Sequence, residues 1–234
     1  VYKRQLLNRY ALATEMSNHS ATFSKDAAFP QSTFNEDISG WNVSNVTTLW
    51  TTFEGATNFN QDISSWNVSK VTSMAATFYN ATNFNQPLDN WDVSSVISMA
   101  WMFRGAENFN QDLNSWITSN VTDMTWMFQL AFKFNGAIGN WDTSEVTNMY
   151  NMFSAWTGRE TFGVFDQDIG GWNVSKVNNM NAMFGNQFNF NQNLNNWNVS
   201  DVQDVGGLFI NCRNFNQPLN NWNMSSANNT EGMF

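Results

Sequence analysis

The side chains that perform most enzyme chemistry are scarce in this sequence of 234 residues. The chain has one His, His19, and one Cys, Cys212, which argues against histidine-based catalysis, the common metal sites and a disulfide scaffold. Among the carboxylates, four share one sequence register: Asp37, Asp62, Asp112 and Asp168. Other copies of that register hold Pro, Ala or Asn, which favours turn-capping Asp over a Ca²⁺ site or a glycosidase pair. We therefore expect no enzyme, no metal and no cofactor.

The shared register belongs to a repeat of 25 residues. Trp recurs at that interval, with one longer step of 31 residues between Trp141 and Trp172. The eight Trp that mark the units are Trp41, Trp66, Trp91, Trp116, Trp141, Trp172, Trp197 and Trp222. Each is preceded by Phe seven residues earlier and followed by Ser three residues later and Phe twelve residues later. A unit this short cannot bury its own apolar face, so neighbouring units must stack.

Within a unit, the hydrophobic spacing changes from two residues to three and four. Trp66 and Val68 alternate with polar residues, which predicts a short strand. Val71, Met74 and Phe78 follow at helical spacing, which predicts a short helix with Ser69, the residue after that strand, as its N-cap. We expect an α/β solenoid of eight such strand–helix units, with a parallel sheet on one face.

Two parts of the chain depart from the repeat. Residues 1–33 precede the first unit, and their partly helical apolar spacing predicts an N-terminal helical cap over the repeats at 34–234. The six extra residues between Trp141 and Trp172 lie at about 156–163, where an insertion predicts a loop. The last unit stops at Phe234 without a cap, and we expect either that the chain continues further or that another molecule covers this end.

Charge and hydropathy exclude two kinds of partner. Ten basic and 19 acidic side chains give a formal net charge of −9, which disfavours nucleic acid because phosphates would be repelled. No run of 18 apolar residues occurs, so the chain contains no predicted membrane-spanning segment.

The repeat unit resembles that of the BspA-like leucine-rich-repeat surface proteins. Its sequence at 59–74 is Phe-Asn-Gln-Asp-Ile-Ser-Ser-Trp-Asn-Val-Ser-Lys-Val-Thr-Ser-Met, and the resemblance extends over about residues 34–234. Such repeats are abundant in mycoplasma lipoproteins and in other microbial surface proteins. The resemblance implies a right-handed leucine-rich-repeat-like coil, an extracellular or cell-surface location, and a role in adhesion or recognition.

Three sets of surface residues are candidate sites. Sequons make glycosylation candidates of Asn18, Asn45, Asn80 and Asn120. The outward residues of the expected sheet form a possible binding face for a glycan or an extended peptide: Asn67, Asn90, Asp92, Asn140, Asp142, Asn196 and Asn198. Trp101 and Trp126, in adjacent repeats, would project from the helices as a contact patch. For the binding face, the alternative is a sheet surface that contacts only water. For the two Trp, the alternative is packing in the groove between successive helices.

These observations predict a non-catalytic surface protein that recognises a protein or glycan. The alternative is a structural subunit that associates end to end into a fibre or sheath, because contacts that do not close produce filaments. Ice binding through the Thr column that begins at Thr47 is a weaker third possibility. The Asn that follows the first Phe of each unit is expected to cap backbone groups in a ladder along the repeats.

Overall fold

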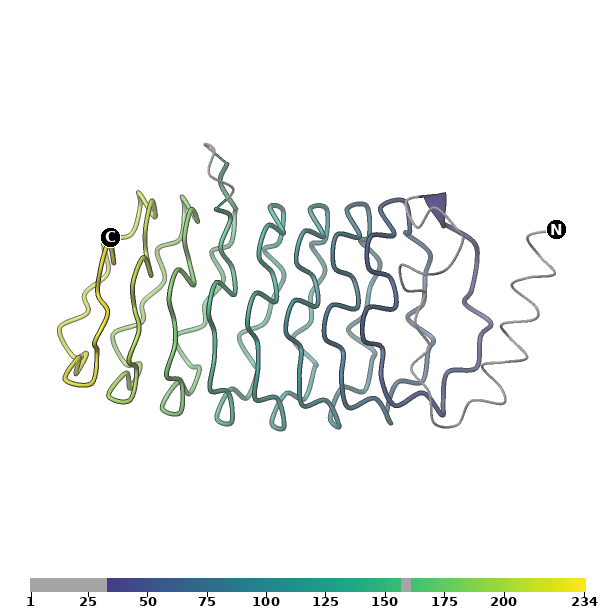
Figure 1. The fold of residues 1–234 in the computed structure, drawn as a ribbon, viewed down its shortest axis with the longest axis horizontal. Coiled ribbons are helices and arrows are strands. Elements are labelled where there is room, and N and C mark those ends of the chain that lie inside the picture. The colour runs from purple at the N-terminus through teal and green to yellow at the C-terminus, as the bar shows by residue number, and fades with distance from the viewer. Residues whose placement is uncertain (1–32, 157–160) are drawn as a thin grey trace.

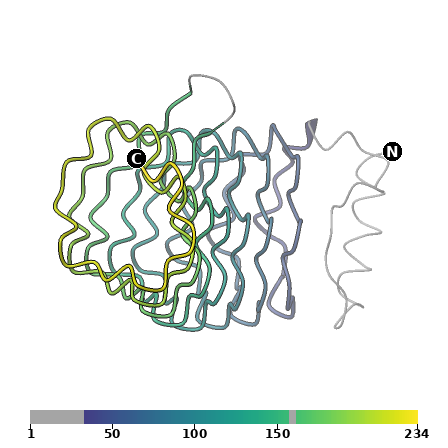
Figure 2. The ribbon, with the colours of Figure 1, turned by 60° about the vertical axis from the view of Figure 1, so that its left-hand side comes forward.

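The computed structural model describes residues 33–156 and 161–234. In these ranges the backbone runs as a row of stacked coils, one coil to each repeat (Figure 1), and a turned view shows the coils following one another along the row (Figure 2). We number the coils 1 to 8 by their Trp, from Trp41 to Trp222. The predicted cap at 1–33, with His19 and Asn18, lies outside the described residues except for Thr33.

No α-helix and no strand of more than one residue forms in the described ranges. Apart from a 3₁₀ conformation at Thr33, the regular structure consists of isolated parallel β-bridges, each joining one residue pair. Seven of these bridges form one continuous line along the coils, through Thr48, Ser73, Ser98, Asp123, Asn148, Asn179, Asp204 and Asn229. An eighth joins Gly163 to Gln187. The described part contains no helix long and apolar enough to cross a membrane.

The predicted α/β solenoid of strand–helix units, with its parallel sheet and leucine-rich-repeat-like coil, is therefore wrong. Left-handed backbone breaks the predicted helix in coil 2, where φ is 55° at Ala76. The N–H groups of Met74, Ala76 and Phe78 donate to carbonyls of coil 3 at 3.0, 2.9 and 2.8 Å. An α-helix would need these donors for carbonyls four residues earlier. A spacing of three and four residues between apolar side chains fits both an α-helix and the run of turns that the chain forms.

The predicted strand fails because the chain turns on both sides of the Trp. In coil 2 the Trp66 N–H donates to the Ile63 carbonyl at 3.1 Å, and the Val71 N–H donates to the Val68 carbonyl at 2.8 Å. Ser69 is not a helix N-cap. Its backbone N–H and its hydroxyl both donate to Oδ1 of Asn67, at 3.2 and 2.7 Å, so it belongs to an Asx turn.

Stacked aromatic columns form the core between the two sides of each coil. Phe78 stacks on Phe53 and Phe103 of the neighbouring coils at 5.3 and 5.4 Å between ring centroids, and on Phe84 at 4.0 Å. Each pair of this kind contributes about 0.5–1.5 kcal/mol beyond its buried area. From Trp66 to Trp222, every Trp of the repeat donates its indole N–H to the Ile or Leu carbonyl of the preceding coil at 2.8–3.2 Å. The Trp column thus fixes the register between coils.

An unbroken ladder of side-chain oxygens links the coils at the Phe-Asn-Gln turn, as predicted. Oδ1 of Asn60 accepts the backbone N–H of Asn85 at 2.9 Å, and Gln86 donates its side-chain amide to the Asn60 carbonyl at 3.0 Å. The first of these bonds recurs in every pair of adjacent coils, at 2.7–3.0 Å. The motif therefore satisfies turn donors that no regular secondary structure would satisfy.

The insertion leaves the core columns in register because Gln187 replaces a missing peptide group. In a regular coil such as coil 2, the N–H of Ala81 donates to the Phe78 carbonyl and its C=O accepts from the Phe84 N–H, both at 3.0 Å. Where the insertion removes that Ala from coil 5, the buried Gln187 side chain of coil 6 makes both bonds. It donates to the carbonyl of Phe153 and accepts from the N–H of Phe165.

Candidate functional site

Four aromatic side chains from coils 2 to 5 follow one another in a row, and three of them surround Arg104. We call Tyr79, Trp101, Arg104, Trp126 and Tyr150 the aromatic shelf. The rings of Trp101 and Trp126 lie 4.6 Å apart between centroids at an interplanar angle of 35°, with Tyr79 5.9 Å from Trp101 and Tyr150 5.5 Å from Trp126. Trp101 is 37% exposed. The shelf is thus a continuous aromatic surface that reaches solvent.

Both Trp side chains are carried on left-handed backbone. The φ angles of Trp101 and Trp126 are 63° and 57°, in a region that costs a non-Gly residue about 1–2 kcal/mol. Most other coils place a small residue at this position: Thr51, Ala76, Asn151, Ala182, Gly207 and Gly232. Left-handed backbone at this position is thus a feature of every coil. What distinguishes coils 3 and 4 is that two neighbouring Trp occupy a position that Gly or Asn would fill more cheaply.

Arg104 is held at the centre of the shelf without a carboxylate partner. Its Cζ lies 5.1, 5.4 and 5.0 Å from the ring centroids of Tyr79, Trp101 and Trp126. Its Nη1 donates to the Tyr79 hydroxyl at 2.6 Å, and its Nε donates to Oε1 of Gln129. In the described part of the chain the one ion pair joins Lys176 to Glu145, elsewhere. The guanidinium is therefore oriented by uncharged groups.

The indole nitrogen of Trp126 has no hydrogen-bond partner although it is buried. It is the one buried side-chain nitrogen or oxygen within residues 33–156 and 161–234 that lacks a partner. Leaving a buried donor unsatisfied costs about 1–3 kcal/mol. Together with the backbone strain, this indicates that Trp126 does not contribute its full potential stability to the fold.

The sequence predicted only part of this shelf. It identified Trp101 and Trp126, and the structure brings them together; it missed Tyr79, Arg104 and Tyr150. A usable signal existed for two of the three, because Tyr79 and Arg104 stand thirteen residues after the Trp of successive repeats. Residues at equal distance from the Trp become neighbours when the coils stack.

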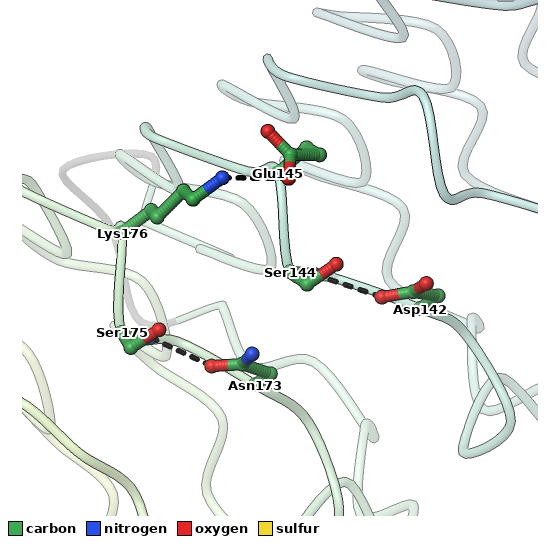
Figure 3. Close-up of polar contacts among 6 residues, drawn as sticks. All are labelled: Asp142, Ser144, Glu145, Asn173, Ser175 and Lys176. Carbon is green, nitrogen blue, oxygen red and sulfur yellow. Dashed lines mark hydrogen bonds and ion pairs between the residues drawn. The ribbon is translucent and has the colours of Figure 1, made fainter.

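The predicted binding face lies on a run of turns, since the described residues form no sheet. All seven of its residues are exposed. Four of them, Asn67, Asp92, Asp142 and Asn198, accept the backbone N–H of the Ser two residues later at 3.0–3.2 Å. Figure 3 shows the Asp142–Ser144 turn beside its counterpart in coil 6, with Glu145 and Lys176 paired at 2.6 Å across the two coils.

The remaining three, Asn90, Asn140 and Asn196, alternate with the turn residues, and Asn140 donates its N–H to Asn114 of the preceding coil at 2.9 Å. A binding role for the face stays a prediction.

The Asx turns lower the pKa of the carboxylates that form them. In Asp92 and Asp142 the pKa lies below its usual value because the side chain and the backbone N–H of the following Ser, Ser94 or Ser144, both donate to the carboxylate. In Asp62, from the register considered for Ca²⁺, the pKa is lowered in the same way by Ser64. These carboxylates therefore serve as turn caps.

The other groups that could carry chemistry in the described residues are the metal-ligating side chains, the thiol of Cys212 and the hydroxyls of the Thr column. No cluster of three or more His, Cys, Asp or Glu that could hold a metal is found in the described part. Cys212 is buried in the column of small Ala residues, as predicted, and burial raises its pKa to about 12. In the Thr column, the hydroxyls of Thr72, Thr122 and Thr147 donate to carbonyls of the preceding coil at 3.2–3.3 Å.

The three glycosylation candidates that lie within the described residues differ in the state of their amides. Asn45 is exposed and its Oδ1 accepts from Lys70 at 2.8 Å. Asn80 is exposed on left-handed backbone. Asn120 donates its side-chain nitrogen, the atom that glycosylation would modify, to the Ser94 carbonyl at 2.7 Å. Asn120 is therefore the least available of the three.

Comparison with known proteins gives one family. A model described as "Mycoplasma protein of unknown function, DUF285" matches residues 13–99, 64–161 and 160–234. Searches of curated proteins and of solved structures gave no match. The three overlapping segments cover nearly the whole chain, as expected for a family defined by a repeat. The chain therefore belongs to the DUF285 family of mycoplasma proteins of unknown function.

Proposed function

We propose that this protein is a non-catalytic recognition protein of the cell surface or extracellular space, with the aromatic shelf as its contact site. The observation that carries the proposal is that two adjacent Trp occupy strained backbone positions and that one of them reaches solvent. Exposed, clustered aromatic residues are enriched at contact sites. The resemblance to BspA-like surface proteins and the membership of a mycoplasma repeat family support the location.

The structure offers little support for catalysis. The Asp residues that could act in pairs are committed to turns, and the thiol of Cys212 is buried. A stack of coils that carries a row of clustered aromatic side chains favours binding.

Replacing Trp101 with Asn tests the proposal. Asn151 occupies the same position in coil 5 at φ 55°, so the Trp101→Asn variant should fold. Its free energy of unfolding should lie within about 1 kcal/mol of that of the wild type. We expect an array of saccharides and extracellular-matrix proteins to show ligands of the wild type that this variant binds at least about tenfold more weakly.

Trp50→Thr is the matched control. Trp50 is 54% exposed in coil 1 outside the shelf, and Thr125 occupies the equivalent position in coil 4. Equal loss of binding in both variants, or full binding by Trp101→Asn, would contradict the proposal.

Light scattering over a concentration series tests the end-to-end alternative: a constant monomer mass is expected for a recognition protein, and growth into regular fibres would favour the structural role.

A further inference from the structure

We propose that the ligand of the aromatic shelf is a saccharide with a terminal carboxylated sugar, whose carboxylate binds Arg104 and whose ring lies against Trp101 and Trp126. The inference rests on the proposed function, and it adds the chemical class of the ligand and the residue that selects it.

The first argument is the unused hydrogen-bonding capacity of Arg104. A guanidinium has five N–H donors in a planar fork. Two of these are used in the structure, by Tyr79 and Gln129. The other three have no partner among the described residues. A carboxylate accepts two parallel N–H donors from such a fork, in the geometry that makes Arg–carboxylate pairs strong.

The second argument is electrostatic. Arg104 is half-buried against three rings in a protein with a formal net charge of −9, yet no carboxylate of the described residues pairs with it. Arg213, the other Arg in the described ranges, also lies over two rings, at 5.5 Å from Phe162 and 5.3 Å from Phe188, but it is exposed. A cation that is fixed, partly desolvated and unpaired is arranged to accept an anion from outside.

The third argument concerns which anion fits. The shelf contains a single cation, and the acidic surface around the molecule repels polyanions such as nucleic acid. A ligand with one terminal carboxylate brings a single negative charge, which the single cation of the shelf can pair. The rings of Trp101 and Trp126 pack on each other with their centroids 4.6 Å apart. The part of Trp101 that this packing leaves exposed offers an apolar surface against which the C–H face of a pyranose can pack, while its hydroxyls stay in water.

Matched pairs of saccharides test the proposal. The probes are oligosaccharides that end in one sialic or uronic acid, each compared with its own methyl ester, which preserves the sugar and removes the charge. We expect the wild type to bind at least one acid at least about tenfold more tightly than its ester, as charge-assisted hydrogen bonds allow. Added salt should reduce this preference.

Variants assign the preference to its residue. Arg104→Gln should bring acid and ester to within about twofold, and Arg104→Lys, which keeps the charge but loses the fork, should retain only part of the preference. Trp101→Asn should weaken the binding of both forms. Arg213→Gln is the control and should keep the wild-type ratio. Unfolding curves of each variant establish that the fold is intact.

Two results would overturn the inference. A wild type that does not discriminate any acid from its ester would contradict it, as would a preference that survives Arg104→Gln. If a neutral saccharide or a protein binds in a manner that depends on Trp101, the proposed function stands and the ligand class is wrong. If no ligand depends on Trp101, both fail.

Discussion

The Asn that follows the first Phe in seven of the eight repeats shows what a single side chain does where the described backbone forms no helix and no sheet. Asn85 accepts the N–H of Asn110 at 2.9 Å and the side-chain amide of Gln111 at 3.0 Å. Its own N–H is accepted by Asn60. Because helix and sheet ladders are absent here, such side chains take over the pairing of backbone donors.

Replacing Asn85 tests the energetic weight of this ladder. Asn85→Ala removes two accepted hydrogen bonds and should lower the free energy of unfolding by about 1–2 kcal/mol, since the affected donors are only partly buried. Asn85→Asp is the control, because Asp166 occupies the same column and accepts equivalent bonds; it should lie within about 0.5 kcal/mol of the wild type. Urea denaturation measures both, and equal losses would contradict the account.

Gln187 carries a larger share of stability because the groups it pairs are buried. Gln187→Ala leaves the carbonyl of Phe153 and the N–H of Phe165 without partners in the core, and we expect a loss of about 2–4 kcal/mol in denaturant unfolding. Cys212→Ala, in the same column one coil later, should cost less than about 1 kcal/mol because coils 1 to 4 already carry Ala there. A smaller loss for Gln187→Ala than for Cys212→Ala would refute the assigned role.

At the scale of the repeat element, the sequence predicted what depends on register and missed what depends on the backbone path. The aromatic columns, the Asn ladder and the pairing of Trp101 with Trp126 follow from equal spacing along stacked units. The helix was mispredicted because a spacing of three and four residues is common to helices and to these consecutive turns. Left-handed backbone at Ala76 or Trp101 has no signal in residue type, and Trp even argues against it.

The Asx turns of each element predict a dependence of stability on pH. The pKa values of Asp62, Asp92 and Asp142 are lowered in the folded state by hydrogen bonds from the following Ser. Their contribution is therefore complete above the unfolded-state pKa of about 4 and is lost as pH falls through the lower folded-state values. Each contribution is small because the groups are exposed.

The double variant Asp92→Asn/Asp142→Asn isolates this effect, because Asn67 and Asn198 form the same turn with uncharged side chains. Melting temperatures measured from pH 7 to pH 3 should fall less steeply below pH 4 in the variant than in the wild type. Identical slopes would show that the turns do not favour the ionised form.

At the scale of the whole molecule, the hydrogen bonds between coils in the described ranges join neighbouring coils, so the molecule should tolerate the loss of one complete period. Deleting residues 60–84 joins Phe59 to Asn85 and lets Asn85 take the place of Asn60 opposite Asn35. We expect this variant to fold, with a lower free energy of unfolding and a lower m-value because it buries less surface.

A deletion of 60–82 is the matched control. It leaves two extra residues at the corner between coil 1 and the next coil, without the Gln that accommodates the natural insertion, and should weaken the stacking of coil 1. Circular dichroism and Trp fluorescence during urea denaturation compare the two. Similar cooperative unfolding of both variants would show that register between coils is not what holds the molecule together.

The amide of Gln187 also provides a rule for protein engineering. A corner of one coil accepts extra residues when the Ala position of the next coil carries Gln, because one side-chain amide restores both bonds of the displaced peptide group. Ala106→Gln should therefore open the corner after Asn80 to a grafted peptide. Foreign epitopes could be displayed at chosen intervals along the row while the aromatic core remains unchanged.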